Sequence, residues 1–457
     1  MTTNNLNNRL GTEPVAPLLL KLSIPSIISM LIQALYNVVD SIYIGHLNSD
    51  ALTGLSIAFP IQMILIAIAV GTGVGTSSLI SRLLGQGNNQ RASNAAEHIL
   101  IISVIYGILL GIIGSLFSKE LISLFSKNPV IIDYGTRYIR IIFIGSTALF
   151  LPMISNNILR GEGNTFIPMI TMLIGSVLNI IFDPLLIFGL WKFPKLGIEG
   201  AAIATVGSRI ISGSFIIIML LSNRNQVKLN MKAFKFDFSI IKDIYAVGLP
   251  AMTMQFLASF MIGGLNIIVG GYNEAAVAAL GIYFRLQSFV FMPVFGLNQG
   301  YMPIIGYNYG HNNPNRMKKT MKYGFMIGFT FTFLGFILFQ IMPTQLVTLF
   351  VDESTKNNEE LISIGTNALK TISLAFPIIG PAIIGSTTFQ AIGKGVPSLI
   401  LSFSRQIILL LPFAYILVRI GGLDWVWYSF PLSEVISFIL LFFWLKKTLK
   451  DVFLEME

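Results

Sequence analysis

Two carboxylates lie inside apolar segments of this 457-residue chain, at Asp40 and Asp183. Asn179 precedes Asp183 by four residues, so these two side chains share one face of a helix. At about 1.5 Å per residue, Asp40 lies roughly 8 Å before Gly45 and Asp183 roughly 12 Å before Trp191, which predicts similar depths. Such oxygen ligands can hold a hard cation, and a carboxylate in a low-dielectric pocket can trade protons instead. The spacing therefore predicts a cation or proton site.

Each aspartate also has a purely structural interpretation. Asp40 could face lipid headgroups at a membrane surface, and Asp183, which directly precedes Pro184, could end a helix in a turn. Ionisable side chains inside a membrane are costly and are usually functional. Two carboxylates at similar depth with a shared polar neighbour therefore favour the functional interpretation.

The elements that must position these residues are membrane-spanning helices. The chain is 54% hydrophobic and 11% charged, against about 25% charge in a soluble domain, and its mean hydropathy is +0.76. The charges cluster and leave twelve apolar stretches, six in each half, of the roughly 20 residues that span a bilayer. We therefore predict an all-α polytopic membrane protein with twelve transmembrane helices.

The second half of the chain is a diverged copy of the first, displaced by 225 residues. Matched pairs include Pro25 with Pro250, Gly71 with Gly296, Gly75 with Gly300, Gly85 with Gly310, and Ser208 with Ser433. Because each copy has an even number of spans, the pattern predicts two six-helix bundles related by a pseudo-two-fold axis along the membrane normal, as in transporters. The predicted units are an N-terminal lobe at residues 1–222, a cytoplasmic linker at 223–243 and a C-terminal lobe at 244–457.

The net charge of +9 indicates membrane topology rather than a surface for nucleic acid. With the N-terminus inside, Lys and Arg gather in the loops on one side, so both termini are predicted to be cytoplasmic. Glu97 and His98 lie near this side, where we expect water around both. We predict a multi-pass protein of the cell (plasma) membrane that acts as a monomer, is surrounded by the lipid bilayer, and has no nucleic-acid partner.

The residues form no pattern that is typical of catalysis or of a structural metal. The chain has no cysteine, which excludes disulfides and thiolate metal sites. Its three histidines have no carboxylates at zinc-ligand spacing, and no nucleophile, base and orienting group form a set. We therefore predict a protein that is not an enzyme and that has no cofactor and no structural metal.

The two copies differ at charged positions. Asp40 is matched by Leu265 and Arg209 by Glu434, while Arg285 and Arg405 lie in later spans. These charges could pair between helices or contact a substrate. Met and Phe side chains form a soft lining for varied organic molecules, although they could equally face lipid or neighbouring helices. The candidate cavity residues are Gln33, Tyr36, Gln255, Met252, Met254, Phe256, Met261, Phe289, Met292, Asn298, Gln299, Tyr301, Arg209 and Glu434.

Several short segments, taken in order, resemble the multidrug and toxic compound extrusion (MATE) transporters over nearly the whole chain. They are Ser23-Ile24-Pro25, Tyr36-Asn37-Val38-Val39-Asp40, Gly71 to Gly87, Ile158-Leu159-Arg160-Gly161-Glu162-Gly163, Gly200-Ala201-Ala202-Ile203-Ala204-Thr205, and Phe389-Gln390-Ala391-Ile392-Gly393. Each is permissive alone, and their order within two six-helix halves is specific.

The resemblance implies a V-shaped pair of bundles that exports drugs or toxic metabolites, often cationic or aromatic, in exchange for Na⁺ or H⁺. The family's cation site in the first lobe falls on Asp40, Asn179, Asp183 and Thr205, with Asn156 or Asn157 nearby. The second lobe lacks the helix 7 and helix 10 carboxylates of the NorM-like branch, so the chain is more similar to the DinF and MepA-like branch. Either coupling ion suits these residues.

Two other classes of function stay open at this point. A lipid-linked oligosaccharide or lipid flippase of the same superfamily would be expected to show fourteen helices and a cavity rich in Arg and Lys. A channel would be expected to conduct without Asp40.

Overall fold

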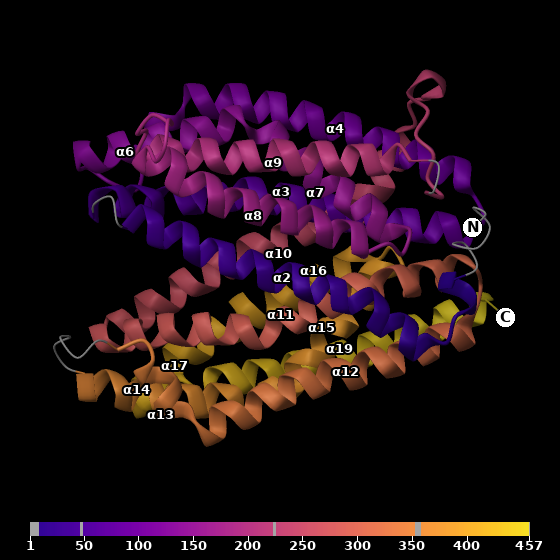
Figure 1. The fold of residues 1–457 in the computed structure, drawn as a ribbon. Helices are drawn as coiled ribbons and strands as arrows, with labels where there is room; N and C mark the ends of the chain where they lie inside the picture. The colour runs from indigo at the N-terminus through magenta and orange to yellow at the C-terminus, as the bar shows by residue number, and fades with distance from the viewer. Residues whose placement is uncertain (1–8, 46–48, 223–224, 352–357, 457) are drawn as a thin grey trace.

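The computed structural model describes residues 9–45, 49–222, 225–351 and 358–456, and in these residues the fold is helical with no strand. Ten helices are long and apolar enough to cross a membrane, and two bent helix pairs raise the number to 12 if each pair is one span. Figure 1 shows the two halves as separate bundles, with the marks for both chain ends at the same end of the molecule. The predicted all-α, two-bundle membrane fold is confirmed.

The N lobe consists of the helices before the connection at residue 221. Its elements are α2 Val15–Gly45, α3 Ser49–Gly85, α4 Asn89–Leu116, α5 Ser118–Ser123, α6 Pro129–Ile144, α7 Ser146–Gly161, α8 Phe166–Phe188 and α9 Ile198–Leu220.

The C lobe repeats this order. Its elements are α10 Phe238–Gly270, α11 Glu274–Gly310, α12 Pro314–Ile341, α13 Pro343–Thr348, α14 Asn358–Ser373, α15 Phe376–Ala391, α16 Gly395–Phe403, η2 Ser404–Leu410, α17 Leu411–Gly421, α18 Leu423–Val426 and α19 Ser429–Met456. A short 3-10 helix, η1 Met231–Ala233, lies in the connection between the lobes.

The fourth span of each lobe is broken in the middle. Helices α6 and α7 meet at 53°, and α14 and α15 meet at 52°. The first break falls at Gly145, where a Cβ atom would collide with Val206 of α9, so only glycine fits beneath that helix. The second break precedes Pro377, which lacks an N–H for the helix and disfavours helical geometry in the residue before it.

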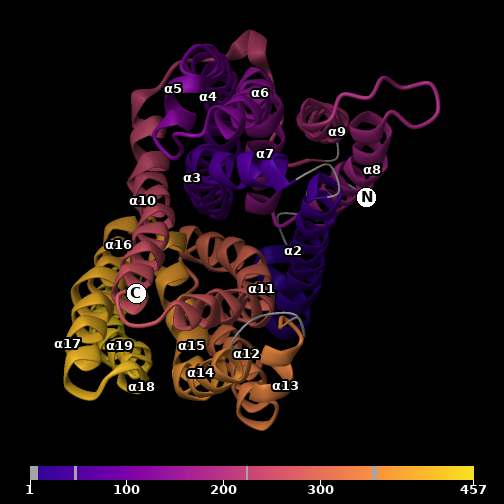
Figure 2. The same ribbon diagram turned by 90° about the vertical axis from the view of Figure 1, so that its left-hand side faces the viewer.

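The lobes meet along two equivalent helix pairs, α3 with α10 and α2 with α11 (Figure 2). Glycine permits each approach. A Cβ atom on Gly71 of α3 would lie 2.7 Å from the carbonyl oxygen of Gly248, and one on Gly300 of α11 would lie 2.8 Å from the nitrogen of Ser23. Ser23 and Gly248 are themselves 225 residues apart, so one contact is made twice. This duplication is what a pseudo-two-fold axis between the lobes requires.

Two more glycines repeat the pattern towards the end of the molecule that holds both termini. Gly85 lies against the carbonyl of Tyr307, and its repeat mate Gly310 lies against the carbonyl of Arg82. All these contacts fall in the halves of α3 and α11 nearest the termini. The lobes are therefore held together most closely at that end.

The connection between the lobes is bound to α4 of the N lobe. The backbone N–H groups of Asn230 and Asp237 donate to Glu97 Oε1 (2.5 Å) and His98 Nε2 (2.8 Å). Glu97 is 4% exposed and His98 is 2% exposed. The prediction that water surrounds both side chains is therefore wrong, because the connection covers them.

A second attachment lies beside the end of α7. Glu162 is buried, and its two carboxylate oxygens accept from the backbone N–H groups of Gln226 (3.1 Å) and Val227 (3.2 Å). Helix α10 then begins at Phe238, inside the range predicted for the linker. Residues 223 and 224 lie outside the described residues, so the predicted lobe boundary there stays a prediction.

Substitution of Gly75 tests the contact between the lobes. A Cβ atom on Gly75 would collide with the backbone carbonyl of Ile244 in α10, and a backbone group cannot rotate away. We expect Gly75→Ala to cost about 1–3 kcal/mol, the usual range for overpacking, and to lower the melting temperature of the purified protein. Gly281→Ala is the matched control, since nothing lies within 4 Å of its added Cβ. Equal melting temperatures for both variants would contradict the proposed contact.

The buried carboxyl of Glu162 predicts a pH-dependent stability. Burial raises the pKa of Glu162 from 4.5 to about 8, although two backbone N–H donors oppose the rise. The folded protein therefore binds this proton more tightly than the unfolded chain, so stability falls as pH rises from about 4.5 to about 8. Glu162→Gln cannot ionise, so the melting temperature of this variant, relative to that of wild type, should rise as pH increases across this window. Glu120 is exposed, so Glu120→Gln should follow wild type. A melting-temperature difference between Glu162→Gln and wild type that stays constant across pH would refute the assignment of this pH dependence to Glu162.

Candidate functional site

Helices α8 and α9 hold the polar core of the candidate site. Asn179 and Asp183 lie one turn apart on α8, and Asn179 Nδ2 donates to Asp183 Oδ1 at 3.3 Å and to Thr205 Oγ1 of α9 at 3.4 Å. All three side chains are buried. Helix α8 continues past Pro184 to Phe188 and ends at Gly189, whose φ of 71° closes the helix in the left-handed region. The interpretation of Asp183 as a helix-ending turn is therefore wrong.

Asp40 reaches this core from α2. It is half-buried, and its carboxyl lies within hydrogen-bonding reach of the Asp183 carboxyl. Two carboxylates have no donor between them, so this contact needs a shared proton or a cation that both oxygens can bind. The structure therefore brings together Asp40, Asp183, Asn179 and Thr205, four of the six residues predicted for the coupling site.

The site contains more acceptors than donors. Asp40 Oδ1, Asp183 Oδ2 and Asn179 Oδ1 are all buried without a hydrogen-bond partner. Pro184 has no N–H, so the carbonyl of Ile180 also lacks its usual helical donor. Unpartnered buried oxygens are costly, and a proton or a monovalent cation would satisfy them. The donor set therefore fits either coupling ion.

Three further side chains surround the carboxylates. The charge of Arg209 on α9 acts on both Asp40 and Tyr138, and the buried Tyr138 hydroxyl of α6 lies within hydrogen-bonding reach of Gln62 on α3. Within the described residues, Arg209 forms no salt bridge. Sequence reasoning missed Tyr138 and Gln62 as site residues. A polar Gln inside an apolar span was the available signal for Gln62, and no signal marked Tyr138.

The two asparagines of α7 lie apart from this hydrogen-bonded set. Asn157 Nδ2 donates to the carbonyl of Met153 at 2.8 Å and packs against Gly73 of α3. Asn156 is buried with its Oδ1 unpartnered. No hydrogen bond in the described part of the chain joins either asparagine to Asp40 or Asp183.

The predicted cavity residues have very different environments. Tyr301 is fully buried and bonds Thr388 Oγ1 at 2.8 Å, and Met252 is buried against Gly71 between the lobes. Ser402 donates to the sulfur of Met254 at 3.1 Å. The exposed members are Gln255 and Phe289, and the half-buried ones are Gln33, Tyr36, Phe256, Met261, Met292, Asn298 and Gln299. Their contact with a substrate stays a prediction.

The charges that sequence analysis left open take separate environments. Glu434 of α19 bonds Arg405 of η2 at 2.8 Å, whereas Arg285 of α11 is exposed.

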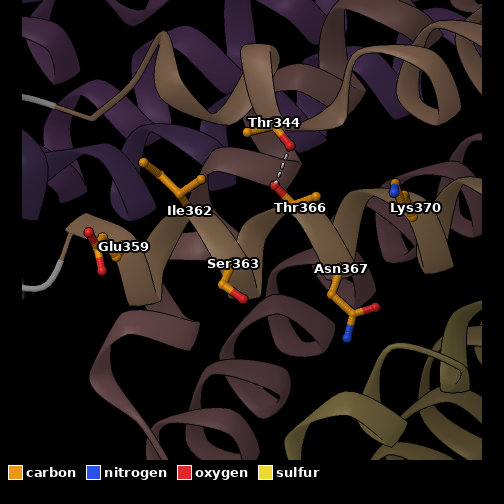
Figure 3. A pocket seen from close by; sticks show the side chains of 7 residues that line it. All are labelled: Thr344, Glu359, Ile362, Ser363, Thr366, Asn367 and Lys370. Carbon is orange, nitrogen blue, oxygen red and sulfur yellow. Dashed lines mark hydrogen bonds between the residues drawn. The ribbon is translucent and has the colours of Figure 1, made fainter.

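A shallow pocket of about 470 Å³ lies at the end of the molecule away from the termini, between α13 and α14 (Figure 3). Across it, Thr366 donates to Thr344 at 3.2 Å. None of the residues predicted for the coupling site or for the substrate cavity lines this pocket.

A comparison with protein families decides the class of this chain. The family model described as MatE matches residues 25–185 and 250–416, which together make up more than half of the chain. The chain belongs to the MATE family. The two matched segments begin at residues 25 and 250, which reproduces the 225-residue offset of the internal repeat.

Individual relatives and a solved structure agree with membership of the MATE family. The chain is 28% identical to the multidrug export protein MepA of Staphylococcus aureus, over 92% of this chain and 91% of that protein. It is 27% identical to a FAD transporter of Shewanella oneidensis, over 93% of each. A multidrug resistance MATE family transporter of the MOP superfamily, solved in an outward-facing conformation, superposes with a TM-score of 0.91 at 29% identity, covering 99% of both chains.

Thr205 provides a test of how the site is organised. Its hydroxyl accepts a hydrogen bond from Asn179, which also donates to Asp183. One such bond is worth about 0.5–1.5 kcal/mol, so at the cation or proton site that the sequence predicts, Thr205→Val should weaken ion binding by up to about tenfold. The measurement is the melting temperature of purified protein during Na⁺ and pH titrations.

Thr171→Val is the matched control for this substitution. Thr171 is also buried, but its hydroxyl bonds only the carbonyl of Ile167 in its own helix, α8. Its ion titrations should therefore follow wild type. Identical titrations for the Thr205 and Thr171 variants would show that Thr205 does not organise the site.

Proposed function

We propose that this MATE family protein is a secondary active antiporter that exports organic compounds in exchange for H⁺ or Na⁺. The observation that carries the proposal is the contact between Asp40 and Asp183. Two carboxylates with unpartnered oxygens in a membrane-spanning bundle have a strong need for positive charge. We infer that the coupling ion meets that need and that its loss on the other side of the membrane resets the site.

Helix α2 supplies a physical route from the ion to the lobes. It carries Asp40 near one end, while Ser23 and Ile27 near its other end contact Gly300 and Gly296 of α11. An ion bound between Asp40 on α2 and Asp183 on α8 favours the arrangement that keeps these helices together. Differential ion affinity between two arrangements of α2 is sufficient to couple ion movement to lobe movement.

The glycine contacts between the lobes define which side is closed. They gather at the end of the molecule that holds both termini. With the termini in the cytoplasm, as the loop charges predict, this arrangement is sealed towards the cytoplasm. An ion from outside would then reach Asp40 and Asp183 while substrate leaves outward, which is the order that antiport requires.

The substrate class follows from the relatives. The names of MepA and of a probable multidrug resistance protein of Bacillus subtilis, 27% identical over 93% of this chain, indicate export of drugs. We propose large organic molecules, often cationic and aromatic. The FAD transporter relative favours a flavin nucleotide as the second candidate. FAD as an added competitor of dye export would distinguish the two.

Expression in a drug-sensitive bacterium tests the proposal. Wild type should raise tolerance to ethidium, and Asp40→Asn should abolish the increase while folded protein remains in the membrane, because one carboxylate of the pair is lost. Asp50→Asn is a control, since Asp50 lies in the first turn of α3 at the end of the molecule away from the termini. Undiminished efflux by Asp40→Asn would rule out its coupling role.

Vesicles extend the same experiment to the coupling ion. A Na⁺ gradient and a pH gradient are imposed separately on vesicles that contain purified protein, and dye movement is followed by fluorescence. One gradient should drive movement in wild type and fail in Asp40→Asn. Movement under neither gradient would count against antiport itself.

A further inference from the structure

The C lobe contains an ion pair inside its helical bundle. Arg405 Nη1 of η2 and Glu434 Oε1 of α19 lie 2.8 Å apart, with side chains 30% and 11% exposed. The other carboxylate oxygen, Glu434 Oε2, is buried without a hydrogen-bond partner. Charged side chains within a span face the interior of a bundle or a water-filled space rather than lipid. This pair is therefore an internal feature of the C lobe.

The internal repeat places this pair on the two helices that correspond to α8 and α9 of the N-lobe site. The 225-residue offset matches Arg209 with Glu434 and Asn179 with Ser404, the residue before Arg405. In the N lobe, the acids lie on α2 and α8 and the base lies on α9. In the C lobe the base lies on η2, the counterpart of α8, and the acid lies on α19, the counterpart of α9.

The local backbone explains how Arg405 comes to face α19. Residues Ser404–Leu410 form a π-helix, which ends just before Pro412. Proline removes one helical hydrogen bond and its ring crowds the preceding turn, and a wider π turn relieves both effects. Such a turn also rotates the residues before it relative to a regular helix. The N-lobe counterpart, α8, is a regular helix through Pro184.

The two sites differ in how their carboxylates are compensated. Among the described residues, neither Asp40 nor Asp183 forms a salt bridge, whereas Glu434 pairs with the guanidinium of Arg405. The C-lobe positions that match Asp40 and Asp183 are Leu265 and Ile408. Leu265 is buried in the same apolar cluster as Tyr283 and Phe430. The matching positions therefore supply no second carboxylate beside Glu434, and a proton is a cation that one carboxylate can take alone.

We propose that Arg405 is a tethered counter-ion that occupies the place a proton would otherwise take at Glu434. Among the described residues around this pair, the C lobe then has no unpaired acid for a coupling proton, and ion coupling is confined to the N lobe. Removal of the charge on Arg405 should make Glu434 a proton-binding group. The proposal deepens the proposed function, on which it rests for taking Asp40 and Asp183 as the coupling site.

Few other titratable groups can act on Glu434. Arg405 on η2 and Tyr283 on α11 are the groups whose charges interact with it. Helices α15 and α16, which also pack against α19, carry no Asp, Glu, His, Lys, Arg or Tyr. Other charged or titratable residues on helices packed against α19 are Glu359, Glu360 and Lys370 of α14, Tyr415 and Arg419 of α17, and Lys318 of α12, which lies over the ring of Phe453. A new pH dependence in an Arg405 variant can therefore be assigned by also removing Glu434.

The test compares Arg405→Gln with Arg405→Gln/Glu434→Gln in purified full-length protein. Both variants lack the guanidinium, and only the first retains the acid. A buried, unpaired carboxyl favours its protonated form, so the melting temperature of Arg405→Gln should fall relative to the double variant by at least about 2 °C between pH 5 and pH 9. Arg405→Lys keeps the positive charge and should follow wild type.

Two further measurements make the outcome decisive. Infrared spectra at pH 6 should show a protonated carboxyl band in Arg405→Gln that is missing from the double variant. Parallel melting curves for the two variants across pH, or no difference in this band, would overturn the proposal. A Na⁺-dependent gain at constant pH would overturn the proton assignment.

Folding and transport failures are separated from failure of this inference. If Arg405→Gln cannot be purified at pH 8, recovery of the folded variant at pH 5.5 supports the proposal. If this variant is recovered at neither pH while the double variant folds, the proposal is contradicted. These stability measurements need no substrate and no gradient. Failure of ethidium export by wild type would instead contradict the proposed function. The stability measurements on the Arg405 variants could still be interpreted in that case.

Discussion

The close approach of backbones between the lobes is the constraint on which the rest of the structure depends. Gly71 and Gly75 of α3 lie against the backbone of α10, and their repeat mates lie against the backbone of α2. Backbone atoms of the facing helix lie close to each of these glycines, so the packing has little freedom to adjust. Because the same contact occurs twice, α2 and α10 are held in equivalent positions between the bundles. The place of Asp40 on α2 follows from this arrangement.

Duplication gives the two lobes the same architecture. Divergence between the copies gives the lobes different charged residues, which is the asymmetry that the proposed ion coupling needs. The N lobe places two acids together with no donor between them, while the C lobe places leucine and isoleucine at the matching positions. The C-lobe acid Glu434 is already paired with Arg405. Desolvation makes a carboxylate pair without a salt-bridge partner costly, and in the proposed mechanism this cost favours the binding of a positive ion at the N-lobe site. A carboxylate that is already paired with a guanidinium, as Glu434 is with Arg405, has no comparable driving force to bind a positive ion.

The sequence was sufficient to predict features that depend on segment length and local periodicity. Apolar length predicted the twelve spans, and helical spacing with equal depth predicted the contact of Asp40, Asn179 and Asp183. Features that depend on the rotation and packing of distant helices escaped prediction. Tyr138 and the burial of Glu97 are examples, since the first depends on how α6 packs and the second on how the connection between the lobes folds back. The Arg405–Glu434 pair stayed open because a π-helix sets its rotation.

Helix α2 is the element in which these constraints meet. One end is fixed by backbone contact with Gly296 and Gly300, so movement of the lobes must displace it. Its other end carries Asp40, whose partner Asp183 belongs to the N-lobe pair α8 and α9. In the proposed mechanism, an ion that joins the two carboxylates therefore opposes displacement of α2 relative to α8. Without the ion, the two carboxylates repel each other and favour that displacement. In the antiport that we propose, lobe movement and ion occupancy are coupled through this one helix, without any need for a second ion site.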